Sequence, residues 1–441
     1  MNSGYSRGPR LVSIDVSLLI STILLCIIGV MFIYSSSITA TGDLRTNEYL
    51  RQIIWLIPGI LIMIGVAFVD YKVYRDFVFY IFLSTILLLL LTLFFGQVVY
   101  GGRRWIGVGG LGFQSSEFAK LAYILFMAIL IEKNRVRLNS PIFLTVLLLI
   151  TALPMGLILM QPDLGTASVF IPIFLVMIFV AGANMWFIIF FTGTIVASIF
   201  FALLPAWMNY VVQNEVPVIT VLQSTTYVAI IVSALYTIAA ACAAGWFLLR
   251  KPIYIAGIFL GFVIGTGILG GLISTYILRD YQMMRLVVFM NPNIDPRGAG
   301  WNILQSLTAV GSGGLTGKGF LLGTHSHYQY IPQQTTDFIF SIIAEEWGFI
   351  GSILLFILFL IIVVRGMIIC RLAKDGFGAY VSAGIVAMIF YHFTINIGMA
   401  IGLMPITGLP LFFVSYGGSS LWIGLISIGI LQSVYRNRHS Y

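Results

Sequence analysis

The chain has few charged residues and few cysteines. Asp, Glu, Lys and Arg make up 9% of its 441 residues, whereas a soluble domain carries about 25%. Its three cysteines, Cys26, Cys242 and Cys370, lie in or beside apolar runs without metal-ligand spacing, so we interpret them as small core residues. The net charge of +8 is dispersed along the edges of apolar runs and does not indicate a nucleic-acid-binding surface.

The chain is rich in hydrophobic residues. Hydrophobic residues make up 60% of the chain, and the mean hydropathy is +1.04. Runs near the length that a helix needs to cross a bilayer, about 20 residues, recur from end to end. They fit helices and not barrel strands, and a spanning segment must satisfy its own backbone groups. The sequence therefore predicts an all-α polytopic integral membrane protein, with residues 1–441 forming a single membrane domain.

We predict twelve spans. The mildly polar segment 205–224, between the seventh and the eighth, could instead hold an interfacial helix. The first ten residues are polar and basic, and the apolar run after them has full spanning length, so we expect no cleavable signal peptide. The predicted spans are 14–36, 52–69, 76–96, 116–132, 141–160, 165–182, 185–204, 225–249, 253–277, 338–364, 378–403 and 411–433.

Lysine and arginine set the expected orientation. With the N-terminus in the cytoplasm, most of the 23 Lys and Arg residues fall in cytoplasmic segments, as the positive-inside rule requires, and both termini are cytoplasmic. The polar material outside then gathers in the loop 97–115 and in a long extracytoplasmic loop, 278–337. Within the long loop, NILQSLTAV has the spacing of a short amphipathic helix at the interface. GSGGLTGKG should form a flexible turn that exposes its backbone.

Asp337 ends the long loop at the threshold of a strongly apolar helix. A charge at a membrane boundary costs several kcal/mol where it is buried, so its presence suggests a function. Asp337 could also cap the helix, as could Thr335 and Thr336, and capping is compatible with accepting a proton from a substrate hydroxyl. Glu345 and Glu346 follow about two turns later, where we expect them to pair with polar groups of neighbouring helices.

Arg103, Arg104 and Trp105 lie in the outer loop 97–115, among glycines. Arginine matches phosphate oxygens in a bidentate manner, so the pair could form a phosphate site. Equally, tryptophan and arginine are typical anchors at a membrane interface. The spacing alone does not decide between these two interpretations.

Three further charges lie within or between predicted spans. Glu117 and Lys120 are at positions i and i+3, on one helix face. Lys120 needs a partner in its apolar run, and Glu117 is the nearest; the pair either faces a polar cavity or fixes helix packing. Asp163 belongs to Gln-Pro-Asp-Leu-Gly, which is typical of a reverse turn and of a helix cap, so local sequence favours a structural role.

Two other segments stand out. His325 and His327 form an HxH pair, but no further ligand lies at standard spacing, so we interpret them as solvent-exposed loop residues. Residues 402–420 are rich in Gly, Pro and Ser. Irregular backbone at membrane depth is tolerated only inside protein or beside a cavity, which predicts that this segment lines a cavity or groove.

Taken together, these segments resemble the SEDS proteins of bacterial cell-wall synthesis, the family of RodA, FtsW and SpoVE. The resemblance covers about 14–182 and 279–435. Lys318-Gly-Phe-Leu-Leu-Gly-Thr, followed by His325-Ser-His and Ile331-Pro, is more similar to the RodA members, which act in elongation. The motifs that carry it are Arg103-Arg-Trp-Ile, Gln114-Ser-Ser-Glu-Phe-Ala-Lys, Gln161-Pro-Asp-Leu-Gly, Asp295-Pro-Arg-Gly-Ala-Gly, Thr336-Asp-Phe-Ile-Phe with Ala344-Glu-Glu, and 402–420.

The resemblance implies a peptidoglycan glycosyltransferase. Such a protein polymerises lipid II at the outer face of the cytoplasmic (inner) membrane during cell elongation and shape maintenance, inverting the anomeric centre and releasing undecaprenyl diphosphate. The implied partners are a class B penicillin-binding protein, which is a transpeptidase, the undecaprenyl-linked glycan and the elongation machinery, with no nucleic acid.

The resemblance also implies roles for individual residues. Asp337 matches the family's essential acidic residue and is the expected catalytic base. A divalent cation, Mg²⁺ or Mn²⁺, could share the charge of the leaving group, although no metal cage is visible in the sequence, and no organic cofactor is expected. The expected substrate-binding residues are Arg103, Arg104, Trp105, Glu117, Lys120, Asp163 and Lys318.

Two departures and two alternatives stay open. Thr335-Thr336-Asp337 has threonine where the family commonly has histidine before Thr-Asp-Phe, and twelve spans exceed the usual ten, which places an inserted pair within 205–277. One alternative is a lipid II flippase or other transporter, but that needs charges along a transbilayer path, whereas Asp337 and Arg103–Trp105 sit at one face. The other is a non-catalytic cell-wall scaffold, which predicts that Asp337 is dispensable.

Overall fold

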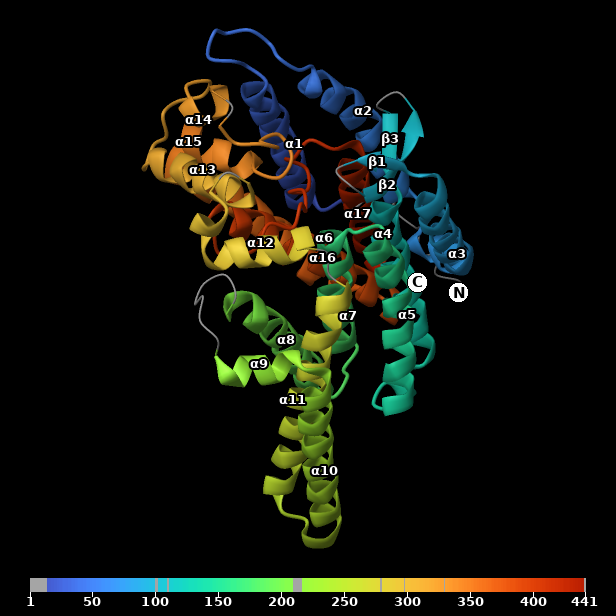
Figure 1. The fold of residues 1–441 in the computed structure, drawn as a ribbon. Helices are drawn as coiled ribbons and strands as arrows, with labels where there is room; N and C mark the ends of the chain where they lie inside the picture. Colours follow the sequence, from blue (N-terminus) through green and yellow to red (C-terminus); the bar gives the residue numbers. More distant parts are fainter. Residues whose placement is uncertain are drawn as a thin grey trace, which may run out of the picture. The chain divides into compact units, whose positions relative to one another are not determined.

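The structure is a computed structural model that describes residues 14–99, 102–108, 111–208, 216–277, 280–296, 298–328 and 330–439. Helices dominate these ranges (Figure 1). Ten of the described helices are long and apolar enough to cross a membrane, which confirms the predicted all-α polytopic fold. They are α1 (Val16–Ser36), α2 (Glu48–Phe68), α3 (Tyr71–Phe95), α5 (Pro141–Met160), α8 (Met185–Trp207), α10 (Thr225–Leu249), α11 (Pro252–Ile277), α15 (Ile339–Leu372), α16 (Gly376–Ala400) and α17 (Gly418–Arg436).

The two other predicted spans are also helical. The fourth is α4 (Ser115–Lys133), in which every stretch of 18 residues holds more than two charges, and the sixth is split into α6 (Leu164–Ser168) and α7 (Phe170–Val180). All twelve predicted segments are therefore helical, and the number that crosses the membrane stays a prediction. Some boundaries were wrong: α2 starts four residues early, α15 runs on to Leu372, and the last helix begins only at Gly418 because 411–417 is not helical.

The chain divides into two compact units. The first comprises 1–181, 309–397 and 407–441 and contains every predicted site residue. In it, α1 packs along α15, α2 along α17, and α3 along α4. The second comprises 182–308 and 398–406. It contains α8, α10, α11, α9 (Pro217–Gln223), α12 (Asp280–Met290), the 3₁₀ turn η3 (Pro292–Ile294) and the start of α13 (Ala299–Ser312).

Glycines on two faces of α11 let its neighbours in the second unit approach closely. A Cβ at Gly257 would lie 2.6 Å from Cys242 Sγ on α10, and one at Gly271 would lie 2.6 Å from Phe201 Cβ on α8. Small residues at such contacts are how apolar helices pack in a bilayer, where helix burial gains no hydrophobic energy. The region 205–277 thus includes a helical hairpin, α10–α11, in which α11 packs against α8. The short helix α9 lies within 205–224, the segment for which an interfacial helix was the alternative prediction.

Between α3 and α4 the chain forms a small sheet, which the sequence did not predict. Strands β1 (Gln97–Val99), β2 (Gly102–Val108) and β3 (Leu111–Gln114) pair antiparallel in the order β1-β2-β3, with Trp105 opposite Gln114. The strands are short and rich in glycine, which is depleted in strands, so no alternation of polar and apolar residues was visible. Because Gln114 is also the N-cap position of α4, the sheet fixes where α4 begins.

Helix α15 is kinked at Gly348, which has φ 64° and ψ −158°. The glycine-rich turn before it docks on the kink. Phe349 N donates to Gly314 O at 2.9 Å, and Lys318 N donates to Glu345 O at 3.0 Å. The expectation of a turn that exposes its backbone was therefore wrong here, because α15 takes up those groups. The predicted amphipathic helix exists as α13, and its place at the membrane interface stays a prediction.

Candidate functional site

Asp337 is half-buried in the turn that leads into α15. The N-cap residue of α15 is Phe338, whose side chain makes no capping hydrogen bond. The expectation that Asp337, Thr335 or Thr336 is the N-cap residue was therefore wrong, since the N-cap lies one residue after Asp337.

The turn that carries Asp337 lies against the irregular segment 407–417. Tyr416 N donates to Thr335 O at 2.9 Å, and Ser415 Oγ donates to Thr336 O at 2.6 Å. Gly408 has φ 76°, and a Cβ placed there would lie 3.6 Å from Asp337 Oδ2. The predicted irregular backbone is confirmed over 407–417, and it lies beside the carboxylate. That the segment lines a cavity stays a prediction.

A buried ion pair lies next to the same segment. Lys120 Nζ is 2.6 Å from Glu117 Oε1, and the two side chains are 0% and 2% exposed, so the predicted pairing is confirmed. Lys120 Nζ also lies 2.9 Å from His392 Nε2, and His392 Nδ1 lies 2.9 Å from Pro410 O. A lysine ammonium only donates and a carbonyl only accepts. His392 is therefore a neutral imidazole with its proton on Nδ1, linking α4 to the segment beside Asp337.

Asp163 is the N-cap of α6. Its Oδ1 accepts from Thr166 N at 3.0 Å, and its Oδ2 accepts from Thr166 Oγ1 at 3.0 Å and from Gln114 Nε2 at 3.1 Å. The capping interpretation is confirmed, and Asp163 also ties α6 to the end of β3. A contact between Asp163 and substrate stays a prediction.

The two arginines of β2 bind different helix ends. Arg103 Nη1 donates to Phe94 O at 2.9 Å, whereas Arg104 Nε donates to Gln161 O at 3.3 Å and its Nη2 donates to Pro162 O. Neighbouring strand residues point to opposite faces, so the structure does not bring the two guanidinium groups together. Each lies at the C-terminal end of a helix, α3 or α5, where the dipole favours a cation.

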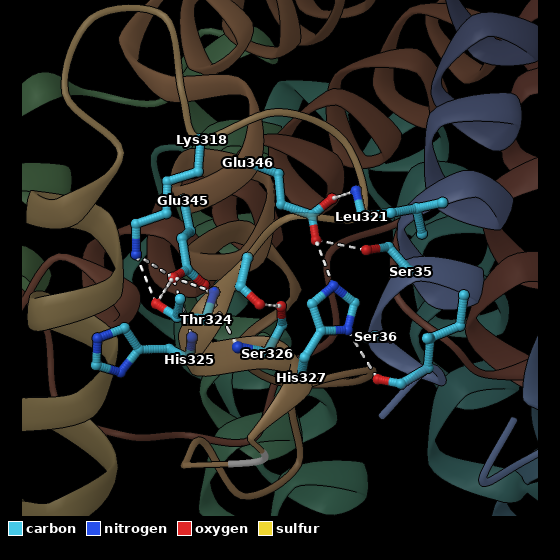
Figure 2. A network of polar contacts seen from close by, with 12 residues as sticks. Ser35, Ser36, Lys318, Leu321, Thr324, His325, Ser326, His327, Glu345 and Glu346 are labelled. Atoms are coloured by element: carbon cyan, nitrogen blue, oxygen red, sulfur yellow. Dashed lines mark hydrogen bonds and ion pairs between the residues drawn. The ribbon is translucent and has the colours of Figure 1, made fainter. Parts of the chain in front are cut away.

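Lys318 belongs to a second polar cluster, around Glu345 (Figure 2). Its Nζ is 2.7 Å from both Glu345 Oε1 and Thr324 Oγ1, and its side chain is 27% exposed. The buried Glu345 also accepts from the backbone N–H groups of Thr324 and His325 at 2.9 and 3.0 Å. Thr324 and His325 belong to the short helix α14 (Thr324–His327), so Glu345 does pair with polar groups of a neighbouring helix, and it also pairs with Lys318 of the loop.

Glu346 faces helix α1 instead (Figure 2). It accepts from Ser35 Oγ at 2.5 Å and from Leu321 N at 3.1 Å, and His327 Nε2 lies 3.9 Å from its Oε1. Ser35 is a polar group of a neighbouring helix, as predicted. The His327 side chain is only 10% exposed, so the expectation of a solvent-exposed residue was wrong for it. Within the described ranges, no group of three or more His, Cys, Asp or Glu is placed to hold a metal ion.

The structure thus sorts the predicted residues into three places. Asp337 and the Glu117–Lys120 pair adjoin 407–417, and Lys318 lies in the Glu345 cluster. The two arginines and Trp105 lie on the sheet, and Asp163 is bonded to its last residue, Gln114. Sequence reasoning missed His392 and Asn396, which are fully buried on α16. Their signal was present, because two polar residues at i and i+4 in an apolar span share one face and point to a polar environment.

The sequence is similar to a set of named proteins over almost its whole length. It is 42% identical to the peptidoglycan glycosyltransferase RodA of Treponema pallidum over 424 residues, which is 95% of this chain and 97% of that protein. It is 33% identical to the stage V sporulation protein E of Bacillus subtilis, covering 96% and 97% of the two chains. It is 29% identical to the peptidoglycan glycosyltransferase MrdB of Escherichia coli K12, covering 97% and 95%.

The fold is similar to that of solved structures. One is a peptidoglycan synthase complex described for its coordination of polymerization and crosslinking, with a TM-score of 0.66, 24% identity, and 98% and 100% of the two chains covered. Another is the rod shape determining protein RodA of Thermus thermophilus, with a TM-score of 0.60, 23% identity and the same coverage. A family model described as a cell cycle protein, that of FtsW, RodA and SpoVE, matches residues 16–215 and 208–440. The chain belongs to the FtsW/RodA/SpoVE family.

Proposed function

We propose that this protein is a peptidoglycan glycosyltransferase that polymerises lipid II into glycan strands during cell elongation. The names of its RodA and MrdB relatives support the activity. The observation that carries the site is Asp337, a half-buried residue directly before the N-cap of α15, in a turn fixed by hydrogen bonds from 407–417. An aspartate held in this way is suited to accept a proton.

In the proposed reaction Asp337 is the general base. The free sugar hydroxyl of the acceptor lipid II gives its proton to the carboxylate, and its oxygen attacks the anomeric carbon of the growing lipid-linked strand. The new C–O bond forms as the bond to undecaprenyl diphosphate breaks, and inversion converts an α-linked donor into a β-1,4 linkage. Asp337 leaves the step protonated, and the leaving group carries away the bonding electrons.

The leaving diphosphate requires positive charge near it. We assign this role first to Arg104, which is half-buried and bound to the Gln161–Pro162 turn, and then to the exposed Arg103 and the half-buried Lys318. The buried Lys120 is already paired with Glu117, so its place in this site is to hold α4, α16 and 407–417 together. Within the described ranges no group of three or more His, Cys, Asp or Glu is placed to hold a metal ion, and a role for Mg²⁺ or Mn²⁺ in sharing the diphosphate charge stays a prediction.

We also propose that the protein works with a class B penicillin-binding protein, which crosslinks the strands, in the cytoplasmic membrane with both termini inside. The distribution of lysine and arginine supports the orientation. The partner is supported by a structural neighbour from a complex that coordinates polymerization and crosslinking.

The test compares polymerisation by wild type and Asp337→Asn. Each is purified with its class B penicillin-binding protein and given labelled lipid II and a transpeptidase inhibitor. Loss of a general base reduces the rate by about 10²- to 10⁴-fold, so we expect polymer from wild type and almost none from Asp337→Asn. The control is Asp43→Asn, which removes an exposed carboxylate from the first unit, and all variants are first matched for melting temperature and complex formation.

The other outcomes separate the alternatives. Equal polymer from wild type and Asp337→Asn would leave the activity intact and remove Asp337 as the base. No polymer from either, together with movement of lipid II across vesicle membranes, would favour a flippase. No polymer and no movement, with the complex still formed, would favour a scaffold.

A further inference from the structure

Asn396 joins two backbone segments of the site. Its Nδ2 donates to Asp337 O at 3.0 Å and to Leu409 O at 2.8 Å, and its side chain is fully buried on α16. Both partners are carbonyls, which only accept, so the amide has one allowed orientation, with the NH₂ group toward them. A single side chain therefore fixes the main chain at Asp337 and at the segment that faces it.

This contact completes a series along the turn. Three consecutive carbonyls are each held by one donor: that of Thr335 by Tyr416 N, that of Thr336 by Ser415 Oγ, and that of Asp337 by Asn396. The first two donors belong to 407–417 itself. The third comes from a helix, so it ties both segments to α16 rather than only to each other.

The second carbonyl that Asn396 holds lies next to Gly408. The positive φ of Gly408 and its lack of a side chain bring backbone close to Asp337, where an added Cβ would be 3.6 Å from Oδ2. The same amide thus sets the position of the carboxylate and of the backbone beside it. Without this amide, the half-buried carbonyl of Asp337 and the buried carbonyl of Leu409 would each lose a hydrogen bond, which is costly inside a protein.

We propose that Asn396 is a positioning residue for Asp337, holding the carboxylate and the Leu409 backbone in the geometry that proton transfer requires. The inference rests on the proposed role of Asp337 as the base. Asn396 acts through the main chain, so it should affect the chemical step and not the capture of lipid II. A displacement of about 1 Å at a reacting group can cost on the order of 100-fold in rate.

The first experiment measures kcat and KM for lipid II polymerisation by the full complex. Asn396→Leu keeps the branched shape and the number of heavy atoms and removes the donor, so we expect kcat to fall about 10- to 100-fold with KM within about twofold of wild type. Asn396→Gln keeps an amide and should recover part of the loss. The matched control is Ser382→Ala on the same helix, a buried hydroxyl that bonds only Gly378 O of α16 and should leave both constants unchanged.

A second readout does not depend on activity. Hydrogen exchange should speed up in 333–338 and 407–417 of Asn396→Leu and stay at the wild-type rate in Ser382→Ala. If Asn396→Leu does not fold, Asn396→Ser takes its place in both experiments. Wild-type kcat in the folded variant, a change in KM alone, or unchanged exchange in both segments would overturn the proposal.

The two proposals can fail separately. If Asp337→Asn polymerises as well as wild type, the base assignment fails while the exchange result still reports the contact. If Asp337→Asn is inactive and Asn396→Leu is fully active, the base stands and the positioning role is removed.

Discussion

Lys120 is fully buried, and its Nζ lies within hydrogen-bond distance of Glu117 Oε1 and His392 Nε2. Removing one member of a buried ion pair leaves the other charge buried without compensation, whereas removing both can be nearly neutral. The main effect of the pair on stability is therefore seen when one partner is removed and the other is left as an unpaired buried charge.

We expect Lys120→Met and Glu117→Gln each to reduce the free energy of unfolding by about 3–5 kcal/mol. The double variant should be more stable than either single variant, because no unpaired charge remains. Thermal unfolding of the four proteins in one detergent gives the coupling energy as a double-mutant cycle. Losses that simply add would show that the two side chains do not stabilise each other.

At the scale of residues, the sequence predicted contacts between residues that are near each other along the chain. Glu117 and Lys120 are three residues apart, so helix periodicity was enough to pair them. Asp163 was recognised as a cap for the same reason. His392 is 272 residues from Lys120, and no local pattern connects them. That contact depends on how α4 and α16 pack, which spacing along the sequence does not report.

At the scale of elements, the kink in α15 is the feature that local sequence could not locate. Gly348, Gly351 and Gly366 all lie in this apolar helix, and an isolated glycine in a helix is tolerated without a kink. Only the docked turn singles out Gly348, because its positive φ depends on contacts with the backbone at Leu315 and Gly317. The strands between α3 and α4 were missed because glycines interrupt the alternation of polar and apolar residues that indicates a strand.

We expect Gly348→Ala to destabilise the protein by at least about 1–3 kcal/mol, the usual cost of a residue held in a sparsely populated backbone conformation. The added Cβ would also lie 2.8 Å from the Leu315 carbonyl carbon. The measurement is the melting temperature of the purified protein. Gly65→Ala is the control, a helical position in α2 with nothing within 4 Å of the new atom, where stability should stay the same or rise slightly. Equal effects at both positions would contradict this account of the kink.

At the scale of the whole chain, Asp15 joins three helices of the first unit. Its carboxylate binds Arg365 of α15, with Nε at 2.7 Å, and its backbone exchanges two hydrogen bonds with the Gln432 side chain of α17, at 2.9 and 2.8 Å. Burial raises the pKa of Asp15, whereas hydrogen bonds from Arg365, Leu18 N and Ser17 lower it. The hydrogen bonds together outweigh burial, so the pKa lies below its ordinary value.

This contact makes a pH prediction. Because the folded pKa of Asp15 is lowered, its contribution to stability is complete above the unfolded pKa, about 3.9, and is lost as the pH falls through the folded pKa. We expect Asp15→Asn to cost about 1.5–3 kcal/mol at neutral pH. The difference in melting temperature between wild type and Asp15→Asn should be constant from pH 7 to 5 and shrink below pH 4. The exposed Asp43→Asn serves as the control, and a difference that grows toward low pH would contradict the sign.

The general architecture was accessible from the sequence because apolar run length reports helices directly. The division into two units was not, since it depends on which helices pack on which. The predicted insertion at 205–277 falls entirely within the second unit, while every predicted site residue is in the first. The sequence could therefore identify candidate site residues, but it could not predict which of them lie close together in space.

The reciprocal contact between Asp15 and Gln432 spans 417 residues of sequence, nearly the whole chain. A ribosome adds about 5–20 residues per second, so α1 is made about 20–80 s before its partner on α17 exists. During that interval the first helix is in the membrane without the groups that hold its start. The first unit therefore cannot finish assembling until α17 has been made, and a chain cut short before Gln432 would leave the Asp15 backbone without its partner on α17.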